Sequence, residues 1–279
     1  MRIGIVVCTF NRTQQIIDCL TSILKLDCGS HEVFKIIISQ RGMNSNRALL
    51  SKFENEFEIV EVERTGKTPL ECINLNRIHG IEIAFKKYGV EAVINVEDDV
   101  LVGRDSLQFA SSVHNQFSNN KNFMLVNFGS RIPPNLCEET NSYSLIRYGM
   151  HGQASWLPVQ TWNRIKKKRL LPKSTIGFDS AIEAFIKTGF VVTPNRSRYL
   201  DTGWDDKATH ATKDPGANSY REMKASFFDS KNKSSVYIHK QLDHRNWRFD
   251  SIAYHSSHDF WHKLKYVYRV NLLRLHGEL

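Results

Sequence analysis

The stretch "VINVEDDV", residues 93–100, places three carboxylates in a row at the end of an apolar run. The run itself, "EAVINV" (91–96), is apolar on both faces, as a central strand of a parallel sheet is. Ligands of open parallel sheets gather at the carboxyl ends of the strands, and Glu97, Asp98 and Asp99 fall at such an end. The stretch therefore predicts a central strand that delivers three acidic side chains to a ligand site.

Three adjacent carboxylates repel one another unless a positive group joins them. A hard divalent cation such as Mg²⁺ or Mn²⁺ would do so, because it binds one or two protein carboxylates and completes its shell with phosphate oxygens and water. The alternative interpretation is a solvated acidic turn, which is common after strands. The triplet alone does not separate the two.

The residues before this strand alternate between strand and helix patterns. Short runs rich in β-branched residues predict further strands at residues 2–10, 33–40 and 57–64. Between the first two, residues 11–26 carry apolar side chains on one helical face, with Asn11 or Thr13 available as the cap. Such a βαβ rhythm predicts an α/β fold with a doubly wound, mostly parallel sheet.

A second helix is predicted over residues 68–89 from its end signals. Thr68 is placed as the N-cap, Pro69 takes the first helical position and Glu71 completes a capping box. Gly89 is placed to end the helix.

The pattern is looser beyond residue 100. Residues 123–130 predict a strand, residues 155–171 and 178–190 predict helices, and residues 191–219 predict a long polar loop of the kind that is functional or disordered. Residues 259–275 predict a basic, aromatic-rich amphipathic helix. This helix either packs on the domain or binds an anionic membrane surface.

The composition limits the number of domains and the classes of protein to which the chain can belong. A length of 279 residues with 41% hydrophobic side chains fits one large domain or one and a half, and no apolar run reaches the 18 residues of a membrane span. The first residues lack the long apolar region of a signal peptide, so we expect them to form the first strand. Five cysteines without zinc spacing indicate buried thiols in a reducing compartment.

The net charge of +9 suits an anionic partner such as nucleic acid, a membrane surface or a phosphorylated substrate. Neither the aromatic signature of RNA-recognition motifs nor the spacing of C₂H₂ zinc fingers is present, so no nucleic-acid partner is expected. The basic run at residues 164–169 is either a solvated face or a contact for acceptor phosphate or lipid headgroups.

Several pieces of the chain occur in the order typical of one enzyme class. They are "VCTFNR" (7–12), "IIISQRG" (36–42), "INLNRIHGIEIAF" (73–85), "VINVEDDVLVGRDSL" (93–107), "FDSAI" (178–182) and "PNRSRYLDTGWDDKATHAT" (194–212). Together they resemble the GT-A glycosyltransferases of the family 2 kind. The nearest likeness is to the N-acetylglucosaminyltransferase I type, whose metal motif is also Glu-Asp-Asp.

The resemblance spans roughly residues 3 to 212 and implies the GT-A fold, a Rossmann-like, mostly parallel sheet with flanking helices. It implies a catalytic domain over residues 1–225, with a nucleotide-sugar-binding half at 1–105 and an acceptor-binding half at 106–225. Residues 226–279 would then be a C-terminal extension.

The resemblance also assigns site residues. Asp99 would be the direct ligand of Mn²⁺ or Mg²⁺, and His210 would close the metal shell or contact the diphosphate. The nucleotide-sugar donor would be bound by Thr9, Phe10, Arg12, Gln40, Arg41, Asn76, Arg77, Glu97, Asp98 and Arg198. The family often has an Asp after the second strand to hold uracil, and Arg41 stands there instead. Either a neighbour such as Gln40 reads the base, or the nucleotide is not uridine.

An inverting transferase needs a carboxylate to take the proton of the acceptor hydroxyl. The resemblance places this base at Asp179, which is otherwise a helix N-cap. Glu183, one helical turn later, is the second candidate. Asp105 either supports the metal loop or caps the next helix.

Three tryptophans, Trp156, Trp162 and Trp204, are candidates to stack on sugar faces. Core packing is the alternative for at least one of the first two, because both lie near a predicted helix.

These observations predict a metal-dependent inverting glycosyltransferase that moves a hexosyl or N-acetylhexosaminyl group from a nucleoside diphosphate, UDP favoured, to a glycan acceptor. The acceptor would be a glycan of bacterial surface polysaccharide synthesis, lipid-linked acceptors included. The enzyme would be cytoplasmic, or peripheral at the inner face of the plasma membrane. Two alternatives remain: a sugar-phosphate nucleotidyltransferase, although "TFNRT" (9–13) lacks the usual glycines, and a non-catalytic nucleotide- or glycan-binding domain.

Overall fold

The computed structural model describes residues 1–10, 12–40, 44–63, 65–130, 143–146, 152–167, 177–179, 181–182, 189–194 and 197–203. Its main sheet contains β1 (Arg2–Thr9), β2 (Glu32–Gln40), β3 (Glu58–Val62), β4 (Ala92–Glu97), β6 (Phe123–Asn127), β7 (Tyr143–Ile146), β8 (Ala154–Pro158) and β9 (Phe190–Pro194). A small second sheet pairs β5 (Val100–Val102) with β10 (Tyr199–Asp201). The helices are α1 (Gln14–Leu24), α2 (Asn44–Leu50), the short 3₁₀ helix η1 (Ser51–Phe53), α3 (Pro69–Lys87), α4 (Ser106–Phe117) and α5 (Val159–Lys167).

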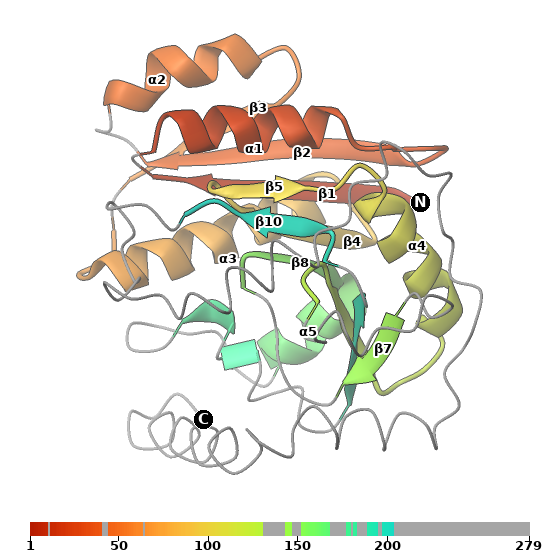
Figure 1. Cartoon of the computed structure of the whole chain (residues 1–279). Helices are drawn as coiled ribbons and strands as arrows, with labels where there is room; N and C mark the ends of the chain where they lie inside the picture. The colour runs from red at the N-terminus through yellow and green to blue at the C-terminus, as the bar shows by residue number, and fades with distance from the viewer. Residues whose placement is uncertain are drawn as a thin grey trace, which may run out of the picture.

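The main sheet has the strand order β3-β2-β1-β4-β8-β6-β9-β7 (Figure 1). The first four strands are parallel, β8 is antiparallel to both of its neighbours, and β9 is parallel to β6. Strands β1, β2, β4 and β6 therefore end at the same edge of the sheet. Whatever follows these four strands in the sequence is collected there.

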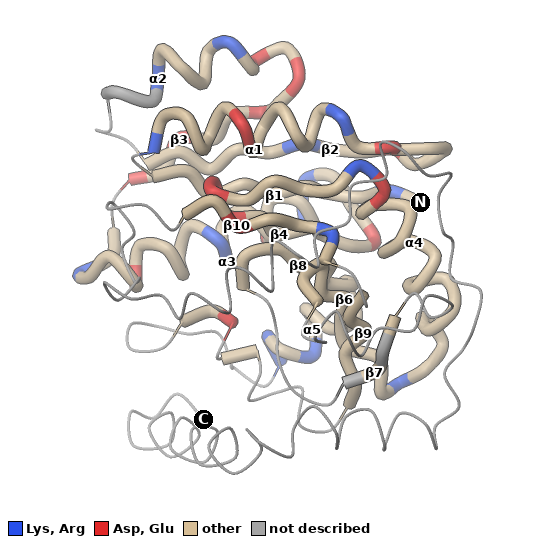
Figure 2. Tube along the Cα trace, in the orientation of Figure 1, with Lys and Arg blue, Asp and Glu red and all other residues tan. Residues whose placement is uncertain are grey.

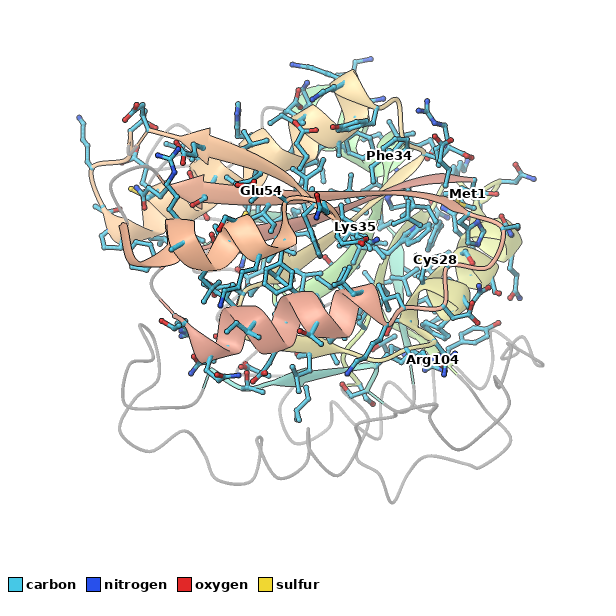
Figure 3. The ribbon with its side chains drawn as sticks, turned by 90° about the horizontal axis from the view of Figure 1, so that it is seen from above. Met1, Cys28, Phe34, Lys35, Glu54 and Arg104 are labelled. Atoms are coloured by element: carbon cyan, nitrogen blue, oxygen red, sulfur yellow. The ribbon has the colours of Figure 1, made fainter. Side chains whose placement is uncertain are left out.

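Helices cover both faces of the sheet. In Figure 1, α1 lies above β1 and β2, and α3 lies below them. One core cluster joins alternate residues of β1, such as Ile5, to α1 and α4, and the other joins Val6 to α3 and α5. Figure 3 shows the same alternation in β2, where Phe34 and Lys35 point to opposite faces. This period of two is what buries both faces of a central strand.

Helix α3 has the predicted end signals. The hydroxyl of Thr68 accepts a hydrogen bond from the Glu71 N–H at 3.1 Å, and Pro69 follows as the first helical residue. The Glu71 carboxylate accepts the N–H of Lys67 at 2.6 Å, one residue before the cap. Gly89 has a φ of +58°, the left-handed conformation that ends helices. The predicted cap, first residue and end are therefore confirmed, whereas Glu71 bonds to Lys67 in place of the Thr68 N–H that a capping box uses.

The predicted cap of α1 is wrong for Thr13. This residue precedes the helix but makes no side-chain cap hydrogen bond, because its backbone is already in the helical region. Asn11 lies outside the described residues.

The helix predicted over residues 155–171 is also partly wrong. Its first residues belong to strand β8, Val159–Lys167 is helical, and residues 168–171 lie outside the described residues. Ser155, Trp156 and Leu157 are fully buried between β4 and β6, and a short buried run has no polar face that would distinguish strand from helix. The long loop predicted from residue 191 likewise contains β10 and most of β9.

Some of the other predictions fall within the described residues, and others fall outside them. Strand β6 confirms the prediction for residues 123–130, and the described pairs 178–179 and 181–182 are helical. Four cysteines, Cys8, Cys19, Cys28 and Cys72, are free thiols. None of the described helices is both long enough and apolar enough to cross a membrane. Cys137 and the predicted helix 259–275 lie outside the described residues.

Replacing Gly80 by alanine tests how closely α3 packs on the sheet. A Cβ at Gly80 would lie 2.8 Å from Cγ1 of Ile38 and nearer still to Cγ1 of Val6. We expect Gly80→Ala to lower the free energy of unfolding by roughly 1–3 kcal/mol through overpacking. Helix propensity favours alanine over glycine by about 1 kcal/mol, so a loose interface would give the opposite sign in urea unfolding. The exposed neighbour substitution His79→Ala is the control, with little expected change.

Candidate nucleotide and metal site

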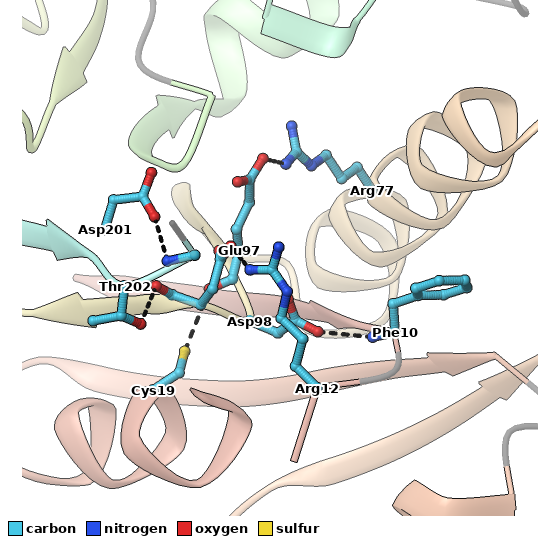
Figure 4. Close-up of polar contacts among 10 residues, drawn as sticks. Phe10, Arg12, Cys19, Arg77, Glu97, Asp98, Asp201 and Thr202 are labelled. Carbon is cyan, nitrogen blue, oxygen red and sulfur yellow. Dashed lines mark hydrogen bonds and ion pairs between the residues drawn. The ribbon is translucent and has the colours of Figure 1, made fainter. Parts of the chain in front are cut away.

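The three carboxylates at the end of β4 each contact a different part of the chain (Figure 4). Glu97 forms an ion pair with Arg77 of α3, and Asp99 forms one with Arg12. Asp98 accepts a hydrogen bond at 2.8 Å from the N–H of Phe10, the residue after β1. Figure 2 shows acidic segments close to β10, with a basic segment of α3 nearby.

The pKa of Asp98 departs strongly from its ordinary value. Burial raises its pKa from 3.8 to about 6, although the Phe10 N–H and the Arg12 charge lower it and Glu97 raises it further. A carboxylate in this state is under-compensated when it ionises. A further positive charge would stabilise its ionised form.

Asp99 is held from above by a turn at residues 201–203. Its main-chain carbonyl accepts hydrogen bonds from the Thr202 N–H at 2.8 Å and from the Thr202 hydroxyl at 2.7 Å. Asp201 accepts the N–H of Gly203 at 2.8 Å, which shapes the turn. Any Cβ at Gly203 would overlap both the Asp99 carboxylate and the Arg12 guanidinium. Only glycine lets the chain close over this pair.

The residues present fit a divalent cation that is bound together with phosphates. Among the residues that the structure describes, no group of three His, Cys, Asp or Glu side chains could hold a metal alone. However, Oδ1 of Asp99 is buried without a hydrogen-bond partner, and Asp98, the preceding residue, is buried as well. Two carboxylates completed by diphosphate oxygens and water are an ordinary Mg²⁺ or Mn²⁺ shell. His210, the other expected ligand, lies outside the described residues.

The predicted donor residues differ in burial and in hydrogen bonding. The Thr9 hydroxyl is buried and donates to the Ile38 carbonyl at 3.3 Å, so it ties β1 to β2. Gln40 ends β2 with only 4% of its surface exposed, and its Nε2 has no hydrogen-bond partner. Asn76 is half-buried on α3, and Arg41 lies outside the described residues.

Arg198, which the resemblance assigns to the donor, is buried in an ion pair. The residue is 3% exposed, and its guanidinium donates to Oδ2 of Asp105 at 3.3 Å and lies 4.0 Å from the centre of the Phe109 ring. Burial lowers the pKa of Arg198, and the Asp105 charge acts against this. Asp105 stands at the N-cap position of α4 but makes no side-chain cap hydrogen bond. The pair supports the loop that leads from β5 to α4.

The main chain of Arg198 strengthens the same support. Its carbonyl accepts the N–H of Gly103 at 2.7 Å and the hydroxyl of Ser106 at 2.9 Å, while its N–H donates to Phe128. This places Arg198 beside the loop after β5 and at the end of β6, three residues before the turn over Asp99.

Asp179, the candidate base, lies at the edge of the same site. The N–H of Phe178 donates to the Asn74 side chain on α3 at 3.1 Å. A Cβ at Gly152 would lie 3.0 Å from Cβ of Asp179, so the main chain before β8 runs directly against this side chain. Glu183, the second candidate, lies outside the described residues.

Both described tryptophans that were expected to bind sugar belong to the core. Trp156 is fully buried and donates to His114 at 3.4 Å, and Trp162 donates to Glu82 at 2.7 Å. The sugar-stacking prediction is therefore wrong for these two, and Trp204 is outside the described residues. Within the basic run, Lys166 forms an ion pair with Glu82 at 2.8 Å, as a solvated face would.

Sequence reasoning missed Asn74, Gly152 and the turn at Asp201–Gly203. A signal existed for Asn74, since it lies three residues before Arg77 and so shares its helix face. Gly152 and the turn carry no local signal, because their role depends on which residues the sheet brings beside them.

Comparison with known proteins supports the fold. No family model matches the chain, and no curated protein sequence matches it. The mannosyltransferase PcManGT from Pyrobaculum calidifontis, solved in complex with GDP-Man and Mn²⁺, aligns with a TM-score of 0.51 at 16% identity over 74% of this chain. TarS 1–349 from S. aureus, solved in complex with UDP-GlcNAc, aligns with a TM-score of 0.53 at 12% identity over 76% of this chain.

The alignments cover 58% and 62% of these two proteins, so the chain spans less than two thirds of their length. At such identities the likeness shows the fold. The predicted α/β fold of the GT-A type, with a mostly parallel central sheet and flanking helices, is confirmed.

The raised pKa of Asp98 predicts a pH-dependent stability difference between the wild type and Asp98→Asn. Between pH 3.8 and about 6 the folded wild type holds a proton that the unfolded chain has lost, so its stability falls as pH rises through this window. The asparagine cannot titrate but can still accept the Phe10 N–H. In a chelating buffer, we expect the wild type to lose up to about 1.4 kcal/mol per pH unit relative to Asp98→Asn, levelling off above pH 6. Parallel curves in urea unfolding would contradict this.

Proposed function

We propose that this chain is a metal-dependent inverting glycosyltransferase that moves a sugar from a nucleoside diphosphate to a glycan acceptor. The observation that carries the proposal is the burial of Asp98 and Asp99, each 8% exposed, at the carboxyl end of β4 in a GT-A fold. A solvated acidic turn would leave such carboxylates exposed. Their burial, with the 201–203 turn closing over Asp99, favours a metal site instead.

The metal is proposed to be Mn²⁺ or Mg²⁺, held by Asp99 with Asp98 beside it and with His210 as a further ligand. When bound, a divalent cation would neutralise charge on the departing nucleoside diphosphate. Arg12 is held at Asp99 and would be available to the phosphates. The structural neighbour PcManGT, solved with GDP-Man and Mn²⁺, supports this choice of partners.

UDP is the favoured nucleotide, and Gln40 is proposed to read its base. The amide of Gln40 offers one acceptor and two donors, which suit the N3–H and O4 groups on one edge of uracil. Its Nε2 is buried without a partner at the end of β2, where the sheet delivers its ligands. The family often has an Asp after the second strand to hold uracil, and this chain has Arg41 at that position. Gln40 would perform the role of that Asp.

Asp179 is proposed as the base. It would take the proton of the acceptor hydroxyl as the oxygen attacks the anomeric carbon from the face opposite the nucleotide, which inverts that centre. Its position beside α3 and Gly152 supports this role, and Glu183 remains the second candidate. The acceptor is proposed to be a glycan, lipid-linked acceptors included, with residues 259–275 contacting the membrane.

Calorimetric titration of UDP, GDP, dTDP and CMP, with and without Mn²⁺, tests the donor site. We expect one nucleoside diphosphate to bind only with metal, and Asp99→Asn to weaken that binding about 100-fold, or roughly 2.7 kcal/mol. Asp18→Asn, an exposed carboxylate on α1, is the matched control and should bind as the wild type does. Absence of binding, or binding that ignores both metal and Asp99, would refute the proposal.

Substitution of Arg12 tests whether it competes with the metal. Because its guanidinium pairs with Asp99, we expect Arg12→Gln to bind Mn²⁺ alone about tenfold more tightly and the nucleotide–Mn²⁺ complex more weakly. Free Mn²⁺ can be followed by electron paramagnetic resonance without any substrate. The exposed Arg104→Gln controls for the change in net charge. Equal Mn²⁺ affinity in the two variants would show that Arg12 does not occupy the metal position.

A further inference from the structure

Arg77 is a buried cation in the middle of α3, and its burial against Glu97 argues against the direct donor contact that the resemblance assigns to it. Only 4% of the residue is exposed, its guanidinium pairs with Glu97, and its Nε is buried without a hydrogen-bond partner. Figure 4 shows it reaching from α3 towards Glu97. A buried guanidinium is costly unless anions surround it, and replacement of its partner leaves that cost uncompensated.

A second carboxylate lies within electrostatic range of the same guanidinium. Burial acts to lower the pKa of Arg77, but the charges of Glu97 and Asp179 act against it and the pKa is raised overall. The guanidinium carbon also lies 5.9 Å from the centre of the Phe178 ring, next to Asp179. One guanidinium therefore interacts electrostatically with both the first residue of the acidic triplet and the candidate base.

The same helix fixes the backbone that carries the base. Asn74 lies one turn before Arg77 and accepts the N–H of Phe178 at 3.1 Å. On the other side, Gly152 lies against the Asp179 side chain, and the Asn95 amide donates to the Gly152 carbonyl at 3.4 Å. Asp179 is thus confined between α3 and the chain that enters β8.

We propose that Arg77 is a positioning residue that joins Glu97 to Asp179 and so sets the distance between the donor site and the base. This rests on the proposed function. A guanidinium is planar and always charged, with several N–H donors in a fixed fork, so it can orient two carboxylates at once. A lysine in its place is a single point charge on a flexible stem and cannot hold both.

The role predicts a loss of turnover without loss of donor binding. The probe is the nucleotide sugar of whichever base the calorimetric panel selects, hydrolysed to release its nucleoside diphosphate. We expect Arg77→Lys to keep nucleotide–Mn²⁺ affinity within about threefold while kcat falls about 10- to 100-fold, because a misplaced catalytic group costs this much. KM for the nucleotide sugar should change little. The exposed Arg104→Lys is the matched control.

Gly152→Ala provides an independent variant in case Arg77 substitutions do not fold. Its new methyl would press on the Asp179 side chain and leave the Arg77–Glu97 pair untouched, so kcat should fall at least tenfold with unchanged nucleotide affinity. Wild-type kcat in both variants, or a parallel loss of affinity and kcat, would overturn the positioning role alone. A wild type that binds no nucleotide would instead refute the proposed function, and the positioning role with it.

Discussion

Like charges at the end of a buried strand must be compensated, and the region around β4 is arranged to do so. Glu97 ends β4, Asp98 and Asp99 form the turn after it, and in the free protein each carboxylate has a different partner. Glu97 is compensated by α3, Asp98 by the main chain after β1, and Asp99 by Arg12. The three contacts together fix how α3 and the segment after β1 sit relative to the sheet edge.

The second half of the described chain completes this arrangement. The N–H of Glu97 donates to the Gln153 carbonyl at 2.9 Å, and Thr202 closes over Asp99 from 103 residues away. Arg198 anchors the approach to that turn through Asp105. Because the acidic triplet depends on contacts from both sides of residue 105, residues 1–105 and the described residues after them form one framework. A substitution in the Arg198–Asp105 pair would therefore alter the position of the turn that packs on Asp99.

Local signals were enough to predict the first part of the fold. The strands β1 to β4 were visible as β-branched runs, and α3 was visible from Thr68, Pro69 and Gly89, since each of these acts on its own neighbours. The acidic triplet could be assigned to a sheet edge for the same reason. The likeness to GT-A enzymes then supplied the order of the remaining pieces.

Long-range pairing could not be predicted in the same way. Strands β5 and β10 have three residues each, too few for a periodic signal, and β8 is buried on both faces. Arg198 was expected at the donor because its segment matched a family motif, yet its partner Asp105 is 93 residues away in the sequence. Trp156 and Trp162 were misjudged because burial, which decides between core and sugar contact, depends on the sheet and helices around them.

The pairing of Arg12 with Asp99 has a consequence for how a metal and a nucleotide would enter the proposed site. A cation that arrives alone must displace Arg12 and leave a guanidinium, which is mostly buried, without its anion. A cation that arrives with a diphosphate brings anionic oxygens that can take up Arg12 in exchange. The contact that compensates Asp99 in the free protein would therefore favour joint binding of metal and nucleotide over binding of the metal alone. The Arg12–Asp99 pair would therefore account both for the charge balance of the free site and for its preference for a metal that binds together with a nucleotide.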